Sequence, residues 1–431
     1  MRKFIAIISF VLLAVVVLTD RTEAAERFRL ATFRCDITPP VGQPLTGPGD
    51  LIKTVEQPLL AKGIVLEADG ERYVICALDW CILCNDSYRK LRAAIAEAAG
   101  VPASHVAVQT VHQHTAPAID INPNPKLTEI TDKKAEEAPP EFEAKAYDSL
   151  VERIASAVKE SLGGFQPFDQ IGSGQAKVDR VASCRRMKDE DGKIQTRWSF
   201  VEDLAVRNLP EGRIDPFLKT ITFARGDKPL ARLHYYATHP QTKYRDGRAS
   251  SDLPGDAREA LERKEGAFQM YFTGCAGDIT LGKYNEATKE NRAELARRLT
   301  AGMEAAVANT KFAPVESLRW RTHQFSPIWK NDGKSEENEK PHEPIELTSL
   351  QVGDVHILHL PGEPMLDFQL YAQRLLPNSF VAVAGYGDDG TGYICPETAF
   401  TEGGYEPSAS LLKPESEELL KKAISALLCV E

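Results

Sequence analysis

Short β-rich runs recur along the whole chain, and segments with apolar residues at helical spacing lie between them. A turn at Asp69-Gly70 divides 63–79 into a predicted hairpin. Further strands are predicted over 28–40, 105–114, 170–179, 217–224, 229–237 and 268–273, and in three runs between 317 and 362. Helices are predicted over 86–100, 140–164, 253–264, 285–308, 364–376 and 415–428. Such intermixing predicts an α/β fold with mixed β-sheets and flanking helices, and no clear linker divides it.

The first residues have the pattern of an export signal. A short basic start precedes the apolar run 4–18, and the small residues Thr22 and Ala24 follow at a plausible cleavage point. A membrane-spanning helix needs about 20 apolar residues, so a cleaved signal peptide, 1–25, is favoured over an uncleaved anchor. The mature chain, 26–431, is therefore expected in the periplasm or outside the cell, with no transmembrane helix.

Charge and cysteine content exclude some classes of protein. The formal net charge of −10 gives no electrostatic reason to bind nucleic acid or an anionic membrane. Eight cysteines in 431 residues do not make a disulfide scaffold. Cys81 and Cys84 have the spacing of half a zinc site, but no second pair completes it. These two cysteines are expected to pack in the core or to form disulfides.

Polar residues gather where the predicted strands end. His112 and His114 end one strand, His239 ends another before a proline, and Glu363 follows a third in "LPGEP". A fourth strand ends in the glycine-rich turn 274–280, "GCAGDIT". Because residues i and i+2 of a strand share a face, His112 and His114 are expected to point the same way. Strand ends are where α/β proteins place their sites.

Two neutral imidazoles and a carboxylate are a ligand set that suits Zn²⁺. Such a set leaves a position for water, and zinc lowers the pKa of that water towards 7. The other histidine of the pair would then serve as a base, an acid or an oxyanion partner. The spacing alone leaves a second interpretation open, since a bare His-x-His is equally satisfied by side chains that face solvent.

The order of these segments resembles the catalytic N-terminal portion of the neutral/alkaline, non-lysosomal ceramidase family. Tyr393 and Tyr405 are twelve residues apart, which is the spacing in that family. The similar segments cover nearly the whole mature chain: "CDITPPVG" (35–42), "VHQHTAP" (111–117), "ASCRRM" (182–187), "YATHP" (236–240), "SSDLPGDAR" (250–258), "GCAGDIT" (274–280), "LPGEP" (360–364) and "GYICPETAFTEGGYE" (392–406). The resemblance implies a ceramidase-like catalytic domain in which His112, His239, Glu363 and Tyr393 bind zinc.

The same resemblance implies roles for the residues around the metal. His114 would face the reacting centre. Arg185 and Tyr405 would hold the substrate carbonyl or the developing oxyanion, as preorganised donors do. Arg186 directly follows Arg185, so the choice between the two arginines stays open. Thr280 matches the position at which ceramidases carry a serine close to the metal.

The chain departs from the family pattern at three places. Thr280 replaces the serine and is followed by Leu281 rather than proline. A threonine keeps the hydroxyl but is stiffer at χ1, and hydrolysis by metal-activated water needs no side-chain nucleophile. Cys184 stands where the family has an asparagine, and Cys275 lies in the Gly-Asp loop, so these two thiols are expected to lie close enough to interact. The C-terminal β-sandwich of the family is expected to be absent.

The expected function is that of a secreted zinc-dependent hydrolase that cleaves the N-acyl amide bond of ceramide or a ceramide-like sphingolipid. Peripheral membrane contact is compatible with such a substrate. Two alternatives are an amidase for a non-lipid substrate and a non-catalytic exported binding protein that keeps the zinc scaffold. An amidohydrolase barrel would need eight regular βα units, which the sequence lacks. A long apolar pocket would favour ceramide, and a shallow polar cleft would favour a small amide or an N-acyl sugar.

Overall fold

The computed structural model describes residues 27–46, 50–121, 142–242, 246–330 and 343–429. The predicted signal peptide lies outside the described residues. Within the described part of the chain, no helix is long and apolar enough to span a membrane.

The first of three large sheets has the strand order β6-β4-β3-β1-β8. Its strands are β6 (Val106–Thr110), β4 (Glu71–Leu78), β3 (Leu60–Ala68), β1 (Phe28–Asp36) and β8 (Gln166–Pro167). Strands β1, β3 and β4 are antiparallel neighbours, and the β3–β4 hairpin turns at the predicted Asp69-Gly70. Strand β6 is parallel to β4. Helix α2 (Asn85–Ala99) connects these two parallel strands, and α4 (Ala144–Ser161) packs beside it.

The second sheet has the order β16-β14-β13-β9-β18. Its strands are β16 (Phe268–Thr273), β14 (Lys228–Tyr236), β13 (Phe217–Arg225), β9 (Gln170–Lys177) and β18 (Lys311–Pro314). Strands β14 and β16 form its parallel pair, and α6 (Asp252–Glu265) connects them. Helix α7 (Lys289–Ala308) crosses the same face of the sheet over β9 and β13.

The third sheet has the order β19-β20-β21-β23. Its strands are β19 (Leu318–Phe325), β20 (Ile345–Val352), β21 (Val355–His359) and β23 (Phe380–Ala384). Strands β21 and β23 are parallel, and α8 (Leu366–Leu375) connects them. Helix α11 (Ser416–Leu427) packs against α8 and β19. Each large sheet therefore contains one strand–helix–strand unit, and each unit has one parallel pair of strands.

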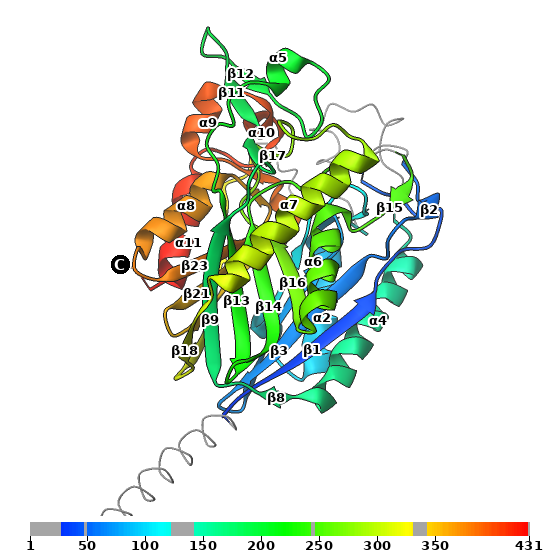
Figure 1. The fold of residues 1–431 in the computed structure, drawn as a ribbon, viewed down its shortest axis with the longest axis vertical. Coiled ribbons are helices and arrows are strands. Elements are labelled where there is room, and N and C mark those ends of the chain that lie inside the picture. Colours follow the sequence, from blue (N-terminus) through cyan, green and yellow to red (C-terminus); the bar gives the residue numbers. More distant parts are fainter. Residues whose placement is uncertain (1–26, 47–49, 122–141, 243–245, 331–342, 430–431) are drawn as a thin grey trace, which may run out of the picture.

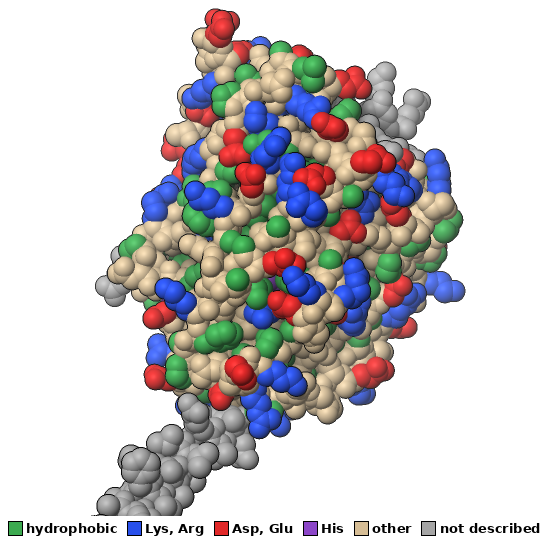
Figure 2. Space-filling view, viewed as in Figure 1, with side chains coloured by type: hydrophobic (Ala, Val, Ile, Leu, Met, Phe, Trp, Pro, Cys, Tyr) green, Lys and Arg blue, Asp and Glu red, His purple; other side chains and the backbone are tan. Residues whose placement is uncertain are grey.

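The three sheets share one apolar core. Leu66 of the first sheet, Phe223 of the second and Ile357 of the third belong to a single cluster of buried side chains. The helices cover the opposite faces of the sheets, as the ribbon in Figure 1 shows. Basic and acidic side chains are interspersed on the face shown in Figure 2. The predicted α/β class with mixed sheets and flanking helices is confirmed.

Candidate metal centre and active site

His112 follows the parallel pair of the first sheet, but it is not part of a strand. Strand β6 ends at Thr110, and His112 has a left-handed backbone with φ of 68°. Such a conformation is uncommon outside glycine and clusters at functional sites. The period-two argument for His112 and His114 was therefore wrong. Their rings are nearly perpendicular, at 87°, with centres 5.1 Å apart.

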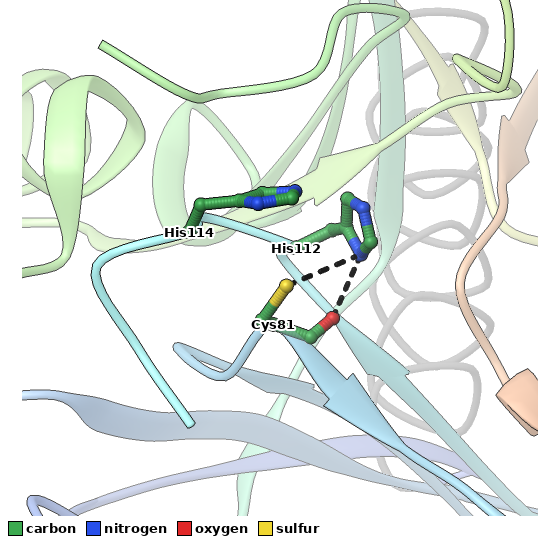
Figure 3. Close-up of side chains that lie close together, drawn as sticks. All are labelled: Cys81, His112 and His114. Carbon is green, nitrogen blue, oxygen red and sulfur yellow. Dashed lines mark hydrogen bonds between the residues drawn. The ribbon is translucent and has the colours of Figure 1, made fainter. Parts of the chain in front are cut away.

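Backbone carbonyls fix the orientation of both buried histidines. His112 Nδ1 lies 2.8 Å from the carbonyl oxygen of Cys81 and 3.8 Å from its Sγ, as Figure 3 shows. His239, which follows β14, places its Nδ1 2.6 Å from the carbonyl of Ala276 and 3.0 Å from that of Ile279. A carbonyl only accepts, so each Nδ1 carries the proton and each Nε2 keeps its lone pair. Cys81, predicted only to pack or to form a disulfide, therefore helps to orient His112.

Glu363 follows β21 of the third sheet and lies at the same point as the two histidines. Its Oε2 lies 3.2 Å from His112 Nε2 and 3.1 Å from His239 Nε2. The preceding Gly362 has φ of +58°, and a Cβ there would meet the carbonyl of Gly392 at 2.5 Å, so the turn favours glycine. His112, His239 and Glu363 are all buried, and their ligand atoms lie within 4.8 Å of one another.

Three lone-pair donors thus meet in a buried space, and this arrangement fits a divalent metal ion. Two imidazole nitrogens with one carboxylate oxygen suit zinc. Burial, followed by the nearby Arg185, lowers the pKa of His239 to about 4, which keeps the imidazole neutral as a metal ligand must be. Burial disfavours a charged His112, yet Cys81 and Glu363 outweigh burial and raise its pKa. A proton and a metal ion therefore compete for Nε2 of His112.

Arg185 lies beside this cluster and links it to the two tyrosines. Its Nε donates to Glu406 at 2.7 Å, and its Nη2 donates to the hydroxyl of Tyr393 at 3.0 Å. The guanidinium lies 5.3 Å from the ring centre of Tyr393 and 5.5 Å from that of Tyr405. Arg186 instead reaches Glu406 and Glu402 from outside. The structure therefore assigns the inward position to Arg185.

Tyr393 is brought to Glu363 by backbone pairing. The short strand β22 (Glu363–Pro364) pairs in parallel with β24 (Tyr393–Ile394), and Glu363 is the partner of Tyr393 in the register. Burial raises the pKa of Tyr393 well above its ordinary value, although Arg185 opposes that rise. Tyr405 is more exposed, with 37% of its surface accessible, and its ring contacts Tyr393 edge-on at 5.5 Å.

Thr280 is buried in the turn that follows β16, and its hydroxyl is engaged. It donates to Ser199 Oγ at 3.0 Å, and Ser199 in turn donates to Gln241 at 2.8 Å. The strand pair β10 (Ser183–Cys184) and β17 (Ile279–Thr280) joins this turn to the Arg185 segment. Cys81, Cys184 and Cys275 are not in disulfides, so neither Cys81 with Cys84 nor Cys184 with Cys275 forms one.

Two residues that contact the candidate site, Glu406 and Tyr386, were not predicted from the sequence. Glu406 is fully buried and neutralises Arg185, and its signal was its place directly after Tyr405. A buried arginine requires such a partner. Tyr386 stacks on the His112 ring at 4.2 Å and places its hydroxyl 3.5 Å from His239 Nδ1. No local pattern singles out Tyr386, because its position depends on the turn after β23.

No family model and no curated protein matches the chain. Solved structures do match, among them the following two. The neutral ceramidase from Pseudomonas aeruginosa is 15% identical, with a TM-score of 0.71 over 94% of this chain and 75% of that chain. A ceramidase complexed with C2 is 15% identical, with a TM-score of 0.72 over 94% of this chain and 76% of that one. The chain has the neutral ceramidase fold. The ceramidase resemblance found in the sequence is thus confirmed at the level of the fold.

Proposed function

We propose that this protein is a zinc-dependent hydrolase of N-acyl amide bonds and a member of the neutral ceramidase superfamily. The convergence of His112 Nε2, His239 Nε2 and Glu363 Oε2 is the observation that carries the proposal. Tyr393 completes the proposed ligand set. The proposed substrate is ceramide or a related N-acyl amide, in line with the fold shared with ceramidases. The proposal includes export of the chain through the signal peptide 1–25.

A zinc ion at these residues would polarise the amide carbonyl and lower the pKa of a water towards 7. His114 is the proposed proton carrier, and burial, followed by the two neighbouring histidines, lowers its pKa well below the ordinary value, so that the imidazole is neutral before the reaction. A neutral imidazole can take the proton of the attacking water and give it to the leaving amine. Its ring centre lies 5.1 Å from that of His112 and 6.1 Å from that of His239.

Arg185 and Tyr405 are the proposed partners of the oxyanion. Arg185 is held by Glu406 and by the hydroxyl of Tyr393, so it does not need to reorganise during the reaction. Preorganised donors of this kind stabilise charge that develops in the transition state. Thr280 is proposed to support the site through Ser199 rather than to act as a nucleophile.

The test combines metal analysis with turnover. His112→Ala and Glu363→Ala should lose both bound zinc, measured by elemental analysis, and hydrolysis of a panel of N-acyl substrates. His323→Ala, on the outer strand β19, is the matched control and should keep both. The mechanism is excluded if purified wild type contains no metal and the two variants hydrolyse the panel as well as wild type does.

A second candidate is a non-catalytic binding protein that keeps the zinc scaffold. The engaged hydroxyl of Thr280 favours it, because the residue that matches the ceramidase serine donates to Ser199. Zinc content does not separate the two candidates. Turnover of any member of the N-acyl panel by the zinc-loaded protein would exclude the binding protein.

A further inference from the structure

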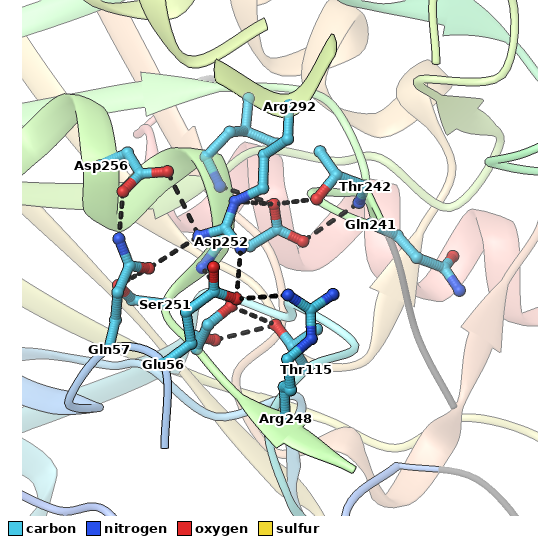
Figure 4. Close-up of polar contacts among 12 residues, drawn as sticks. Glu56, Gln57, Thr115, Gln241, Thr242, Arg248, Ser251, Asp252, Asp256 and Arg292 are labelled. Atoms are coloured by element: carbon cyan, nitrogen blue, oxygen red, sulfur yellow. Dashed lines mark hydrogen bonds and ion pairs between the residues drawn. The ribbon is translucent and has the colours of Figure 1, made fainter. Parts of the chain in front are cut away.

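A pocket of about 180 Å³ lies between β15 (Arg248–Ala249) and the start of α7. It is lined by three cationic residues, one carboxylate and several threonine hydroxyls, among them Arg248, Lys289, Arg292, Glu56, Thr115 and Thr242. Figure 4 shows the polar contacts that surround it. We call it the Arg248 pocket. A single water needs only about 10–15 Å³ of such space, so the pocket has room for a group much larger than one water.

Both arginines in the wall of this pocket are already paired with carboxylates. Arg248 places its Nη2 2.6 Å from Oδ2 of Asp246 and its Nη1 3.1 Å from Oε2 of Glu56. Arg292 lies 3.3 Å from Glu56 and 3.2 Å from Asp256. A charged ligand would have to compete with these ion pairs. A neutral ligand would not, because a guanidinium has five N–H donors and a carboxylate has about four acceptor sites, and these pairs use only part of them.

The buried carboxyl of Asp252 lies behind the wall of the pocket, next to Arg292. Asp252 accepts hydrogen bonds from the backbone N–H of Thr242 at 3.0 Å and from its hydroxyl at 2.5 Å. Burial raises its pKa, although Arg292 opposes the rise. With the ion-pair partners Asp246 and Asp256 counted beside Glu56, three carboxylates balance the three cationic residues of the lining, and the wall is dense in both donors and acceptors. Such a lining matches hydroxyl groups, which donate and accept at the same atom.

The Arg248 pocket is built on the two segments that carry the histidines. Thr115 directly follows His114, and Thr242 lies three residues after His239. Consecutive Cα atoms are about 3.8 Å apart, so Thr242 lies within roughly 11 Å of His239 along the chain. Thr115 Oγ1 donates to the carbonyl of Ser250 at 2.8 Å, which ties this wall to β15. The pocket therefore adjoins the two chain segments that carry the histidines of the proposed metal centre.

We propose that the Arg248 pocket binds a neutral, hydroxyl-rich part of the substrate, such as a sugar ring or a polyol headgroup attached to the N-acyl amide. This assignment rests on the proposed hydrolase function and narrows its substrate class. Recognition uses hydrogen bonds to Arg248, Arg292 and Glu56, and the threonine oxygens accept from the remaining hydroxyls.

Direct binding tests the pocket independently of catalysis. N-acetylglucosamine is the neutral probe and inorganic phosphate the anionic one, each titrated by calorimetry into full-length protein treated with EDTA. We expect the sugar to bind and phosphate to bind at least tenfold more weakly. Arg248→Gln and Arg292→Gln should each weaken sugar binding about tenfold. Lys311→Met, on the exposed edge strand β18, is the control and should change nothing.

Turnover then connects the pocket with the substrate. Arg248→Gln should lower kcat/KM about tenfold for an N-acyl sugar and leave it unchanged for an N-acyl alkylamine with the same acyl chain. Tighter binding of phosphate than of sugar, no sugar binding, or an equal loss on both substrates would each overturn the assignment. If EDTA-treated protein binds the sugar in the expected pattern but no N-acyl compound is hydrolysed, only the proposed hydrolase function fails.

Discussion

Nε2 of His112 lies 3.2 Å from Oε2 of Glu363, although the two residues follow strands of different sheets. Backbone carbonyls accept from Nδ1 of His112 and of His239, so Nε2 of both rings and Oε2 of Glu363 point at one place. This convergence brings residues from the ends of three parallel strand pairs to one place.

Zinc should stabilise the fold through this cluster. A ligand that binds only the folded state at about 1,000 times its Kd contributes roughly 4 kcal/mol. We expect zinc to raise the Tm of the EDTA-treated protein, and Glu363→Gln, which keeps the size of the side chain, to lose most of that shift. Thermal unfolding with and without zinc measures it. An equal shift in wild type and Glu363→Gln would contradict the proposed ligand.

Removal of the Tyr405 hydroxyl should lower kcat while the fold stays intact. The ring is partly exposed and keeps its contact with Tyr393 in the phenylalanine variant. Loss of one oxyanion donor typically lowers kcat about 100-fold or more. Tyr371→Phe removes a hydroxyl that bonds Ser425 and serves as the control. Comparable kcat values for wild type and Tyr405→Phe would remove Tyr405 from the mechanism.

Arg185→Met should destabilise the protein by about 3 kcal/mol, because it leaves part of the buried Glu406 charge unpaired. Urea unfolding measures the change. The double variant Arg185→Met with Glu406→Gln should recover part of the loss, since the carboxylate is then gone. A double variant less stable than the sum of the single changes would show that charge pairing is not the main contribution.

Thr280→Val should cost about 1–2 kcal/mol in free energy of unfolding, because Ser199 loses its donor. Turnover should change little, since metal-activated hydrolysis needs no side-chain nucleophile. Thr280→Ser keeps the hydroxyl and provides the comparison. A folded Thr280→Val protein that binds zinc but has no activity would identify Thr280 as a participant in the chemistry.

Asp278 should make stability depend on pH. Burial raises its pKa to about 6, whereas an unfolded aspartate titrates near 3.9. The folded state therefore binds this proton more tightly than the unfolded state does. Its contribution is fully present below about pH 4 and is lost as the pH rises through about 6, a change of about 3 kcal/mol. Wild type should lose free energy of unfolding between pH 4 and pH 7, as measured by urea unfolding, and Asp278→Asn should remove that loss. The same profile in both proteins would refute the assignment.

Local patterns predicted most elements of the fold. The hairpin at Asp69-Gly70 and the helices α2, α6 and α11 lie within a few residues of their predicted bounds. The strand predicted over 105–114 ended early, at Thr110, because His112 adopts a left-handed conformation that no alternation pattern reveals. Such a conformation is stabilised by tertiary contacts, here the hydrogen bond from His112 N to the carbonyl of Trp80 at 2.9 Å.

The sequence by itself determined the α/β class and the residue types that end the strands, because periodicity and turn chemistry act over a few neighbouring residues. Only the tertiary structure decided which atoms meet. Packing of three sheets around one core brought Glu363 to His112 and His239, and backbone carbonyls set the tautomers of the two histidines. Glu406 pairs with both Arg185 and Arg186, but only Arg185 also reaches the hydroxyl of Tyr393. The contacts of Glu363 with the two histidines and of Glu406 with Arg185 join segments more than 100 residues apart, so they depend on how the sheets pack and leave no local trace in the sequence.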